Sequence, residues 1–136
     1  MKQTILIVDD SPTVLKFVSY SLKSSGFEVV SASDGMNALE KISAIERKID
    51  LVITDLNMPN MDGYTLISKL RNNIEYTETP IIILSSEEDE SDIRMGSDVG
   101  ADSYLIKPFK SSVLLQEVNK YLIGRSRETN QSIRRP

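Results

Sequence analysis

Four short apolar runs in the sequence each end in a polar group that can contact a phosphate. The runs occupy residues 5–8, 51–54, 81–84 and 104–106. Continuous runs of this length, rich in β-branched residues, are typical of strands that are buried on both faces of a parallel sheet. Because ligands of an open parallel sheet bind beyond the carboxyl ends of its strands, we expect the groups that follow the runs to meet in one small site. Those groups are Asp9 with Asp10, Asp55, Ser85 with Ser86, and Lys107.

Strands and helical patterns alternate along the chain. We predict strands at residues 4–8, 27–32, 50–54 and 102–106, and one more that opens at Thr79-Pro80. Helices are predicted from Pro12 to a stop at Gly26, and at residues 37–45, 64–70, 87–99 and 111–123. Asp34-Gly35 is predicted to form a turn, and residues 57–63 a loop. The alternation predicts an α/β fold, namely a doubly wound five-stranded parallel sheet with five helices on its two faces.

The composition excludes several classes of site. The 136 residues include neither cysteine nor histidine. Without histidine the chain has no Ser-His-Asp or Cys-His catalytic group, no histidine metal site and no phosphohistidine of its own. The lack of cysteine fits a reducing compartment, and no apolar stretch approaches the roughly 20 residues that span a membrane. No signal peptide is visible, so we expect a cytoplasmic protein without membrane insertion.

Charge is unevenly distributed along the chain. Residues 124–136 contain four arginines and one glutamate, a net charge of +3, whereas the whole chain carries −4. Residues 1–123 therefore carry −7, and an acidic body of this kind argues against a nucleic-acid surface. The basic segment is polar and lacks periodicity. We accordingly expect one domain over residues 1–123 and a disordered tail over residues 124–136.

The polar groups resemble, in their order and placement, those of receiver domains of the two-component response regulator family. The resemblance covers residues 2–123, and the layout is similar to that of the stand-alone chemotaxis regulators. Each motif alone is weak, but the ordered set, each at the end of its own predicted strand, is specific. The resemblance implies the flavodoxin-like strand order 2-1-3-4-5. The motifs are Asp9-Asp10, Asp55 with Met58-Pro59 and Asp62-Gly63 after it, Ser85, and Lys107-Pro108-Phe109.

The resemblance implies a phosphotransfer reaction at Asp55. This residue would accept a phosphoryl group from a histidine kinase or another phosphohistidine protein, and the acyl phosphate would later hydrolyse. By the same resemblance Asp10, Asp55 and the backbone carbonyl of Asn57 would bind Mg²⁺ directly, and Asp9 would act through water. Independently of the family, carboxylates crowded at one sheet edge repel each other by about 4 kcal/mol per pair at 4 Å. A hard divalent cation such as Mg²⁺ would relieve that repulsion.

The resemblance also implies roles for the remaining polar residues. Lys107 and Ser85 would contact the phosphoryl oxygens, and the Lys107-Pro108 peptide bond would be cis. Tyr104 would act as a switch together with Ser85 and move inward on phosphorylation. That movement would remodel the face formed by the fourth helix, the fifth strand and the last helix, where a downstream protein would bind. The mechanism would be a population shift between two packings.

Asn57 and Glu87 lie two residues past Asp55 and Ser85, at positions that line the path of the attacking water in receivers. The same pair of residue types occurs in chemotaxis regulators with short-lived signals. We therefore expect a short-lived phosphorylated state. Acidic residues at 87–90 and 92 suit the start of a helix and would favour a basic partner.

The same residues permit several alternative functions. Chemotaxis signalling leads, with a generic phosphorelay intermediate or the receiver half of a longer regulator as alternatives. A phosphatase of the haloacid dehalogenase type would need a second aspartate where this chain has Asn57. A receiver fold used only as an interaction module normally lacks one of the acids or the lysine, and here all are present. We expect a signalling switch rather than an enzyme, with self-catalysed phosphotransfer and autodephosphorylation only.

Overall fold

The predicted apolar segments form one parallel sheet. The computed structural model describes residues 2–122, and within them five strands pair in the order β2-β1-β3-β4-β5. This confirms the expected fold class and strand order. The elements are β1 (Thr4–Val8), α1 (Pro12–Ser24), β2 (Glu28–Ala32), α2 (Gly35–Ala44), β3 (Leu51–Thr54), α3 (Gly63–Arg71), the 3₁₀ helix η1 (Ile74–Tyr76), β4 (Ile81–Ser85), α4 (Glu90–Val99), β5 (Ser103–Ile106) and α5 (Ser111–Tyr121).

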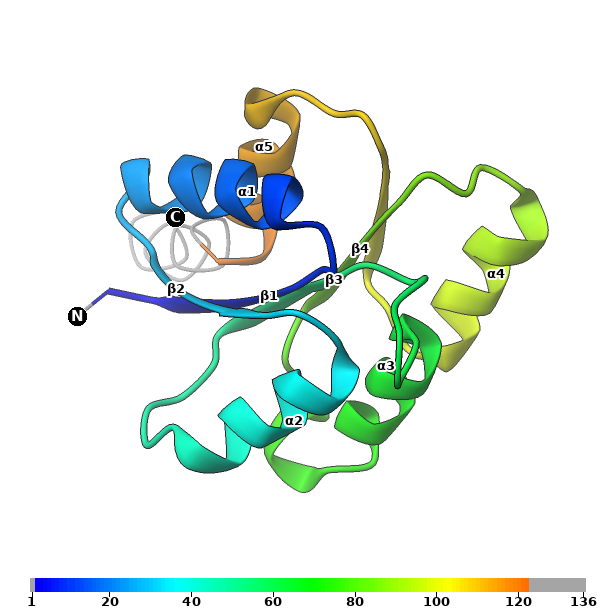
Figure 1. Cartoon of the computed structure of the whole chain (residues 1–136), viewed down its shortest axis with the longest axis horizontal. Coiled ribbons are helices and arrows are strands. Elements are labelled where there is room, and N and C mark those ends of the chain that lie inside the picture. The colour runs from blue at the N-terminus through cyan, green and yellow to red at the C-terminus, as the bar shows by residue number, and fades with distance from the viewer. Residues whose placement is uncertain (1, 123–136) are drawn as a thin grey trace, which may run out of the picture.

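Helices cover both faces of the sheet, which explains why the strands read as continuous apolar runs. α1 and α5 lie on one face, and α2, α3 and α4 lie on the other (Figure 1). Successive strand residues point to opposite faces. Leu6 and Val52 accordingly belong to the core beneath α2 and α3, whereas Ile7 and Ile53 belong to the core beneath α1 and α5. All four side chains are fully buried.

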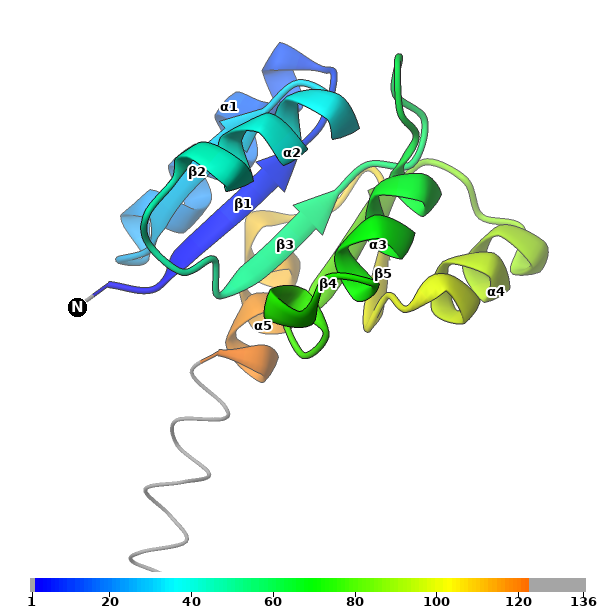
Figure 2. The same ribbon diagram turned by 90° about the horizontal axis from the view of Figure 1, so that it is seen from below.

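The register of the strands brings their carboxyl ends to one edge. Val8 pairs with Thr54 between β1 and β3, and Ser85 pairs with Ile106 between β4 and β5. The residues that follow these strands therefore leave the sheet at the same side. Figure 2 shows that the arrowheads of β1 and β3 point the same way, toward the loop that precedes α3.

Two Asp-Gly pairs begin helices. Asp34 is the N-cap of α2, and its side chain accepts a hydrogen bond from the N–H of Asn37 at 2.8 Å. Asp62 caps α3 in the same manner through the N–H of Thr65, also at 2.8 Å. The turn predicted at Asp34-Gly35 is therefore wrong. Aspartate serves at a helix N-cap as readily as in a turn, because both use its short acceptor side chain.

The fourth helix begins at Glu90 and not at Glu87, as the sequence predicted. Residues 87–89 lie outside the helix, and the carbonyl of Glu87, which a helix would pair with the N–H four residues on, accepts from the Tyr104 hydroxyl at 3.0 Å instead. The other strand and helix boundaries lie within two residues of those predicted, and η1 was not predicted.

No helix within residues 2–122 has the length and apolar character needed to cross a membrane. The predicted basic tail, residues 124–136, lies outside the described residues.

Candidate functional site

Three aspartates meet at the carboxyl edge of the sheet. Asp9, Asp10 and Asp55 each offer a carboxylate oxygen, and these oxygens all lie within 4.8 Å of one another. Asp9 is fully buried, Asp55 is 7% exposed, and Asp10 is exposed. A cluster that offers only carboxylate oxygens suits a hard cation, so its chemistry fits Mg²⁺.

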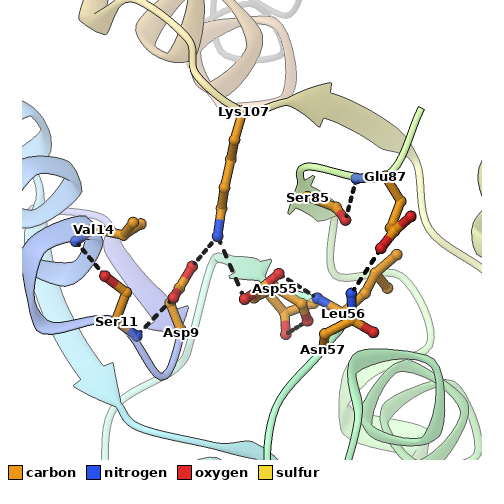
Figure 3. Close-up of polar contacts among 10 residues, drawn as sticks. Asp9, Ser11, Val14, Asp55, Leu56, Asn57, Ser85, Glu87 and Lys107 are labelled. Atoms are coloured by element: carbon orange, nitrogen blue, oxygen red, sulfur yellow. Dashed lines mark hydrogen bonds and ion pairs between the residues drawn. The ribbon is translucent and has the colours of Figure 1, made fainter.

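Asp9 is held on both of its oxygens. Its Oδ1 accepts a hydrogen bond from the N–H of Ser11 at 2.9 Å, and its Oδ2 accepts one from Lys107 Nζ at 2.9 Å (Figure 3). Ser11 is also the N-cap of α1, because its hydroxyl accepts from the N–H of Val14. The residue that begins the first helix therefore also fixes the orientation of the buried aspartate.

Lys107 lies between two aspartates. Figure 3 shows its side chain descending from the end of β5 and ending between Asp9 and Asp55. Its Nζ is 3.4 Å from Asp55 Oδ2, a longer contact than the one to Asp9. The Lys107–Pro108 peptide bond is cis.

The pKa values of Asp55 and Lys107 both rise. Burial raises the pKa of Asp55, and the charge of Asp9 raises it further; Lys107 and the N–H of Leu56 at 2.8 Å oppose this without reversing it. Burial lowers the pKa of Lys107, but its hydrogen bond to Asp9 and the charge of Asp55 outweigh that effect. The acidic cluster thus carries more negative charge than one lysine compensates, which favours a cation.

Ser85, Glu87 and Asn57 form a second group beside the carboxylates. Ser85 is fully buried, and its Oγ accepts from the N–H of Glu87 at 3.1 Å. The Asn57 side-chain amide lies 3.4 Å from Glu87 Oε1, at the long end of hydrogen-bond distance. Both of these side chains are exposed beside Asp55 (Figure 3).

Tyr104 connects this second group to α4. It is half-buried, and its hydroxyl donates to the backbone carbonyl of Glu87 at 3.0 Å. A Cβ on Gly96 in α4 would lie 3.5 Å from the Tyr104 ring, so the ring packs against the helix backbone. Burial raises the pKa of Tyr104. Tyr104 thus connects β5, to which it belongs, with the loop that leads into α4.

Two residues that shape the site were not predicted to do so. Ser11 was predicted only as a helix cap, and its bond to Asp9 has no sequence signal beyond the spacing of two residues. Gly63, the first residue of α3, lies directly behind Asp55: a Cβ there would be 2.2 Å from the Asp55 carbonyl oxygen. The Asp62-Gly63 pair could have suggested this close approach, since glycine often marks contact between two backbones.

Comparison with known proteins gives a consistent result. Residues 5–119 match the family described as response regulator receiver domain. The chain is 35% identical over 118 residues to the protein PilG of Pseudomonas aeruginosa, which covers 87% of this chain and 86% of PilG. Several transcriptional regulators that it also matches are longer, and the chain spans about half of their length.

Two solved structures share the architecture. Chemotaxis protein CheY4 of Vibrio cholerae has a TM-score of 0.84 and 35% identity, over 90% of this chain and 100% of that one. The receiver domain of the sensor histidine kinase PA1611 from Pseudomonas aeruginosa has a TM-score of 0.79 and 29% identity, over 89% of this chain and 98% of that one. The PA1611 structure contains a magnesium ion coordinated in its active site cleft.

Proposed function

Since the chain belongs to the response regulator receiver domain family, we propose that it is a signalling switch in which Asp55 accepts a phosphoryl group. The observation that carries this proposal is the position of Lys107. Its ammonium group lies 2.9 Å from Asp9 Oδ2 and 3.4 Å from Asp55 Oδ2, at the centre of an otherwise acidic cluster. A cation in this place can bind a phosphoryl oxygen on Asp55 while Asp9 holds it in position.

The reaction consists of two displacements at phosphorus. In the first, an Asp55 carboxylate oxygen attacks the phosphorus of a phosphohistidine, the P–N bond breaks, and the imidazole leaves with a proton from solvent. In the second, water attacks the phosphorus, the bond to Asp55 breaks, and inorganic phosphate is released. The donor would be a separate protein, a histidine kinase or another phosphohistidine protein, since these 136 residues contain no histidine of their own.

Asp10 and Asp55, together with the backbone carbonyl of Asn57, would hold Mg²⁺ directly, and Asp9 would act through water. The three carboxylates within 4.8 Å of one another and the raised pKa of Asp55 support this assignment. When bound, Mg²⁺ supplies positive charge that offsets the charge of the transferring phosphoryl group.

Ser85 and Tyr104 would convert phosphorylation into a change of surface. The Ser85 oxygen accepts from the N–H of Glu87, so its own hydrogen can be donated to a phosphoryl oxygen. The Tyr104 hydroxyl donates to the backbone carbonyl of Glu87, so a displacement of Glu87 would move both Tyr104 and the start of α4. A downstream protein would then bind the face of α4, β5 and α5, where acidic residues 87–90 and 92 favour a basic partner.

Asn57 and Glu87 would limit the lifetime of the phosphorylated state. Their side chains approach each other beside Asp55 and are exposed, so they can line the path of an attacking water. Signalling of the chemotaxis type in the cytoplasm is the leading assignment, supported by the similarity to CheY4. The receiver part of a longer regulator, or a phosphorelay intermediate, is the second candidate, and the half-length matches to transcriptional regulators favour it.

The test is phosphorylation of the full chain by a small-molecule phosphodonor with Mg²⁺, followed by intact mass. We expect the wild type to gain one acid-labile phosphoryl group and Asp55→Asn to gain none. Asp98→Asn, which removes an exposed carboxylate in α4, is the matched control and should behave as the wild type. Normal phosphate uptake by Asp55→Asn would contradict the proposal. Multiple turnovers of a phosphate ester would instead indicate a phosphatase.

A further inference from the structure

The loop between β3 and α3 (residues 55–62) is attached to the start of α2 by contacts that the proposed phosphotransfer does not use. Asn60 Nδ2 donates a hydrogen bond to Asp34 Oδ2 at 2.8 Å. Beside it, the Met61 side chain lies so close to Gly35 that a Cβ on that glycine would approach it to within 2.8 Å. Figure 2 shows this loop rising past the end of the sheet, with the first turn of α2 at its side.

We propose that Asn60 is a positioning residue, whose bond to Asp34 holds the β3–α3 loop in the arrangement that allows the Asn57 carbonyl to bind Mg²⁺. This inference rests on the proposed function, because Asn57 is a metal ligand only in that proposal. The contact between Asn60 and Asp34 is itself independent of any metal ion.

Asp34 is a rigid acceptor. Its Oδ1 accepts the N–H of Asn37 at 2.8 Å and so caps α2, while its Oδ2 accepts from Asn60. These hydrogen bonds, that of Asn37 foremost, keep the pKa of Asp34 below its usual value. Asn37 in turn accepts the N–H of Ser33 through its own side chain at 3.0 Å. The loop is therefore attached to a fixed helix terminus.

The backbone conformation of Asn60 indicates that its side chain has a structural role. Its φ is +68°, and among residues 2–122 it alone combines a positive φ with a residue other than glycine. Glycine adopts this conformation freely, whereas other residues strain there, asparagine less than most. Glycine would suit this backbone better. The bond from the Asn60 side-chain amide to Asp34 therefore explains why this position holds asparagine. Strained positions of this kind gather near functional sites.

Asn60 is coupled to Asn57 through the loop backbone, with two residues between them. The loop is fixed at its far end, where the N–H of Gly63 donates to the Leu56 carbonyl at 2.8 Å. Between these ends, a tight turn from the Met61 N–H to the Pro59 carbonyl (2.7 Å) transmits any movement of Asn60 along the segment. Other side chains also hold the segment: Asp55 contacts Lys107 at its start, Asp62 caps α3 at its end, and Asn57 lies 3.4 Å from Glu87. The bond from Asn60 to Asp34, at 2.8 Å and on the surface, is the hydrogen bond that ties the tip of the loop to α2.

The test compares Mg²⁺ affinity in two variants that leave the backbone undisturbed. Asn60→Gly keeps the positive φ and removes the amide, and Asp34→Ser keeps a helix cap and removes the acceptor. Isothermal titration of the full chain with Mg²⁺ should show affinity lowered roughly two- to tenfold in each variant, as expected for one hydrogen bond. The double variant should lose no more than either single one. Hydrogen exchange at the amides of residues 57–61 should become faster in all three.

The control for the loss of one negative charge is Asp62→Ser. Asp62 caps α3 as Asp34 caps α2, but it makes no hydrogen bond to the Asn60 side chain. The affinity of this control variant should remain closer to the wild type than that of Asp34→Ser. The inference is overturned if both single variants bind Mg²⁺ as the wild type does, or if their effects add in the double variant. A wild-type chain that binds no Mg²⁺ would instead refute the metal site of the proposed function, even where the exchange data still show a restrained loop.

Discussion

Gly63→Ala should destabilise the fold, although alanine favours a helix more than glycine does. Gly63 is the first residue of α3, and a Cβ there would lie 2.2 Å from the Asp55 carbonyl oxygen and 2.8 Å from the Leu56 Cα. The first distance is 0.8 Å short of the 3.0 Å that real Cβ contacts respect. Both neighbours are backbone atoms, so no rotamer change can relieve the overlap. Either α3 or the chain at Asp55 must move.

The two opposing effects have comparable known sizes. Replacing glycine by alanine in a helix gains at most about 1 kcal/mol, and less at its first residue. Forcing extra volume into a packed site costs about 1–3 kcal/mol, and the hydrogen bond from the Gly63 N–H to the Leu56 carbonyl is worth about 1 kcal/mol more if it is lost. We therefore expect the free energy of unfolding to fall by about 1–3 kcal/mol.

Urea unfolding followed by far-ultraviolet circular dichroism measures this change, because the chain has no tryptophan for fluorescence. The control is Gly35→Ala, at the first position of α2, where the three atoms nearest to an added Cβ all belong to the flexible side chain of Met61. That variant should change the free energy of unfolding by less than about 1 kcal/mol, since a side chain can move aside. A Gly63→Ala protein as stable as the wild type would refute the argument from backbone contact.

Two further predictions concern polar contacts away from the proposed phosphorylation site. Burial raises the pKa of Glu117, but hydrogen bonds from Ser103 and Lys120 outweigh it and bring the pKa below its ordinary value of 4.5. The stability that this carboxylate adds is thus present above about pH 4.5 and is lost as pH falls through the folded-state pKa, so wild type and Glu117→Gln should converge in urea unfolding in acid. Arg71 donates to three backbone carbonyls and one carboxylate, and Arg71→Ala should cost about 2–4 kcal/mol in the same assay. An exposed control, Arg94→Ala, should stay within about 0.5 kcal/mol, and equal losses in both would contradict this role.

The fold class could be predicted from residues alone because the three central strands, β1, β3 and β4, are buried on both faces. A run such as residues 81–84 is apolar throughout, and this pattern separates parallel from half-exposed antiparallel strands. The order of the strands could not be obtained in this way. Alternating strands and helices permit several orders, and the order 2-1-3-4-5 came from the resemblance to receiver domains.

Sequence reasoning failed where one residue type serves two purposes. Asp34 was assigned to a turn, but it caps α2 and also binds the β3–α3 loop. Glu87 was predicted as the first residue of the fourth helix, whereas α4 begins at Glu90 and the carbonyl of Glu87 accepts from the Tyr104 hydroxyl. In both cases the deciding partner is a side chain whose position depends on the folded structure.

The composition of the site was predictable, but the pairing inside it was not. Parallel topology sends the residues after β1, β3 and β5 to one edge whatever their side chains do. The contact of Lys107 with Asp9, 98 residues away in sequence, depends on side-chain geometry that no spacing encodes. The closer approach to Asp9 than to Asp55 is visible only in the folded chain.

That unequal pairing bears on which aspartate the proposed phosphotransfer would use. Asp9 is fully buried, and its two oxygens accept hydrogen bonds from Ser11 and Lys107, so burial keeps an incoming phosphorus away from it. Asp55 is slightly exposed, and its Oδ1 is held by a backbone N–H while its Oδ2 faces Lys107 at the longer distance. Burial and the charge of Asp9 also raise the pKa of Asp55, so the negative charge of Asp55 is incompletely compensated within the folded chain. A carboxylate that is accessible, oriented and poorly neutralised is the one that gains most by forming a bond to an electrophilic phosphorus beside a lysine. These differences favour Asp55 over its buried neighbour as the phosphoryl acceptor.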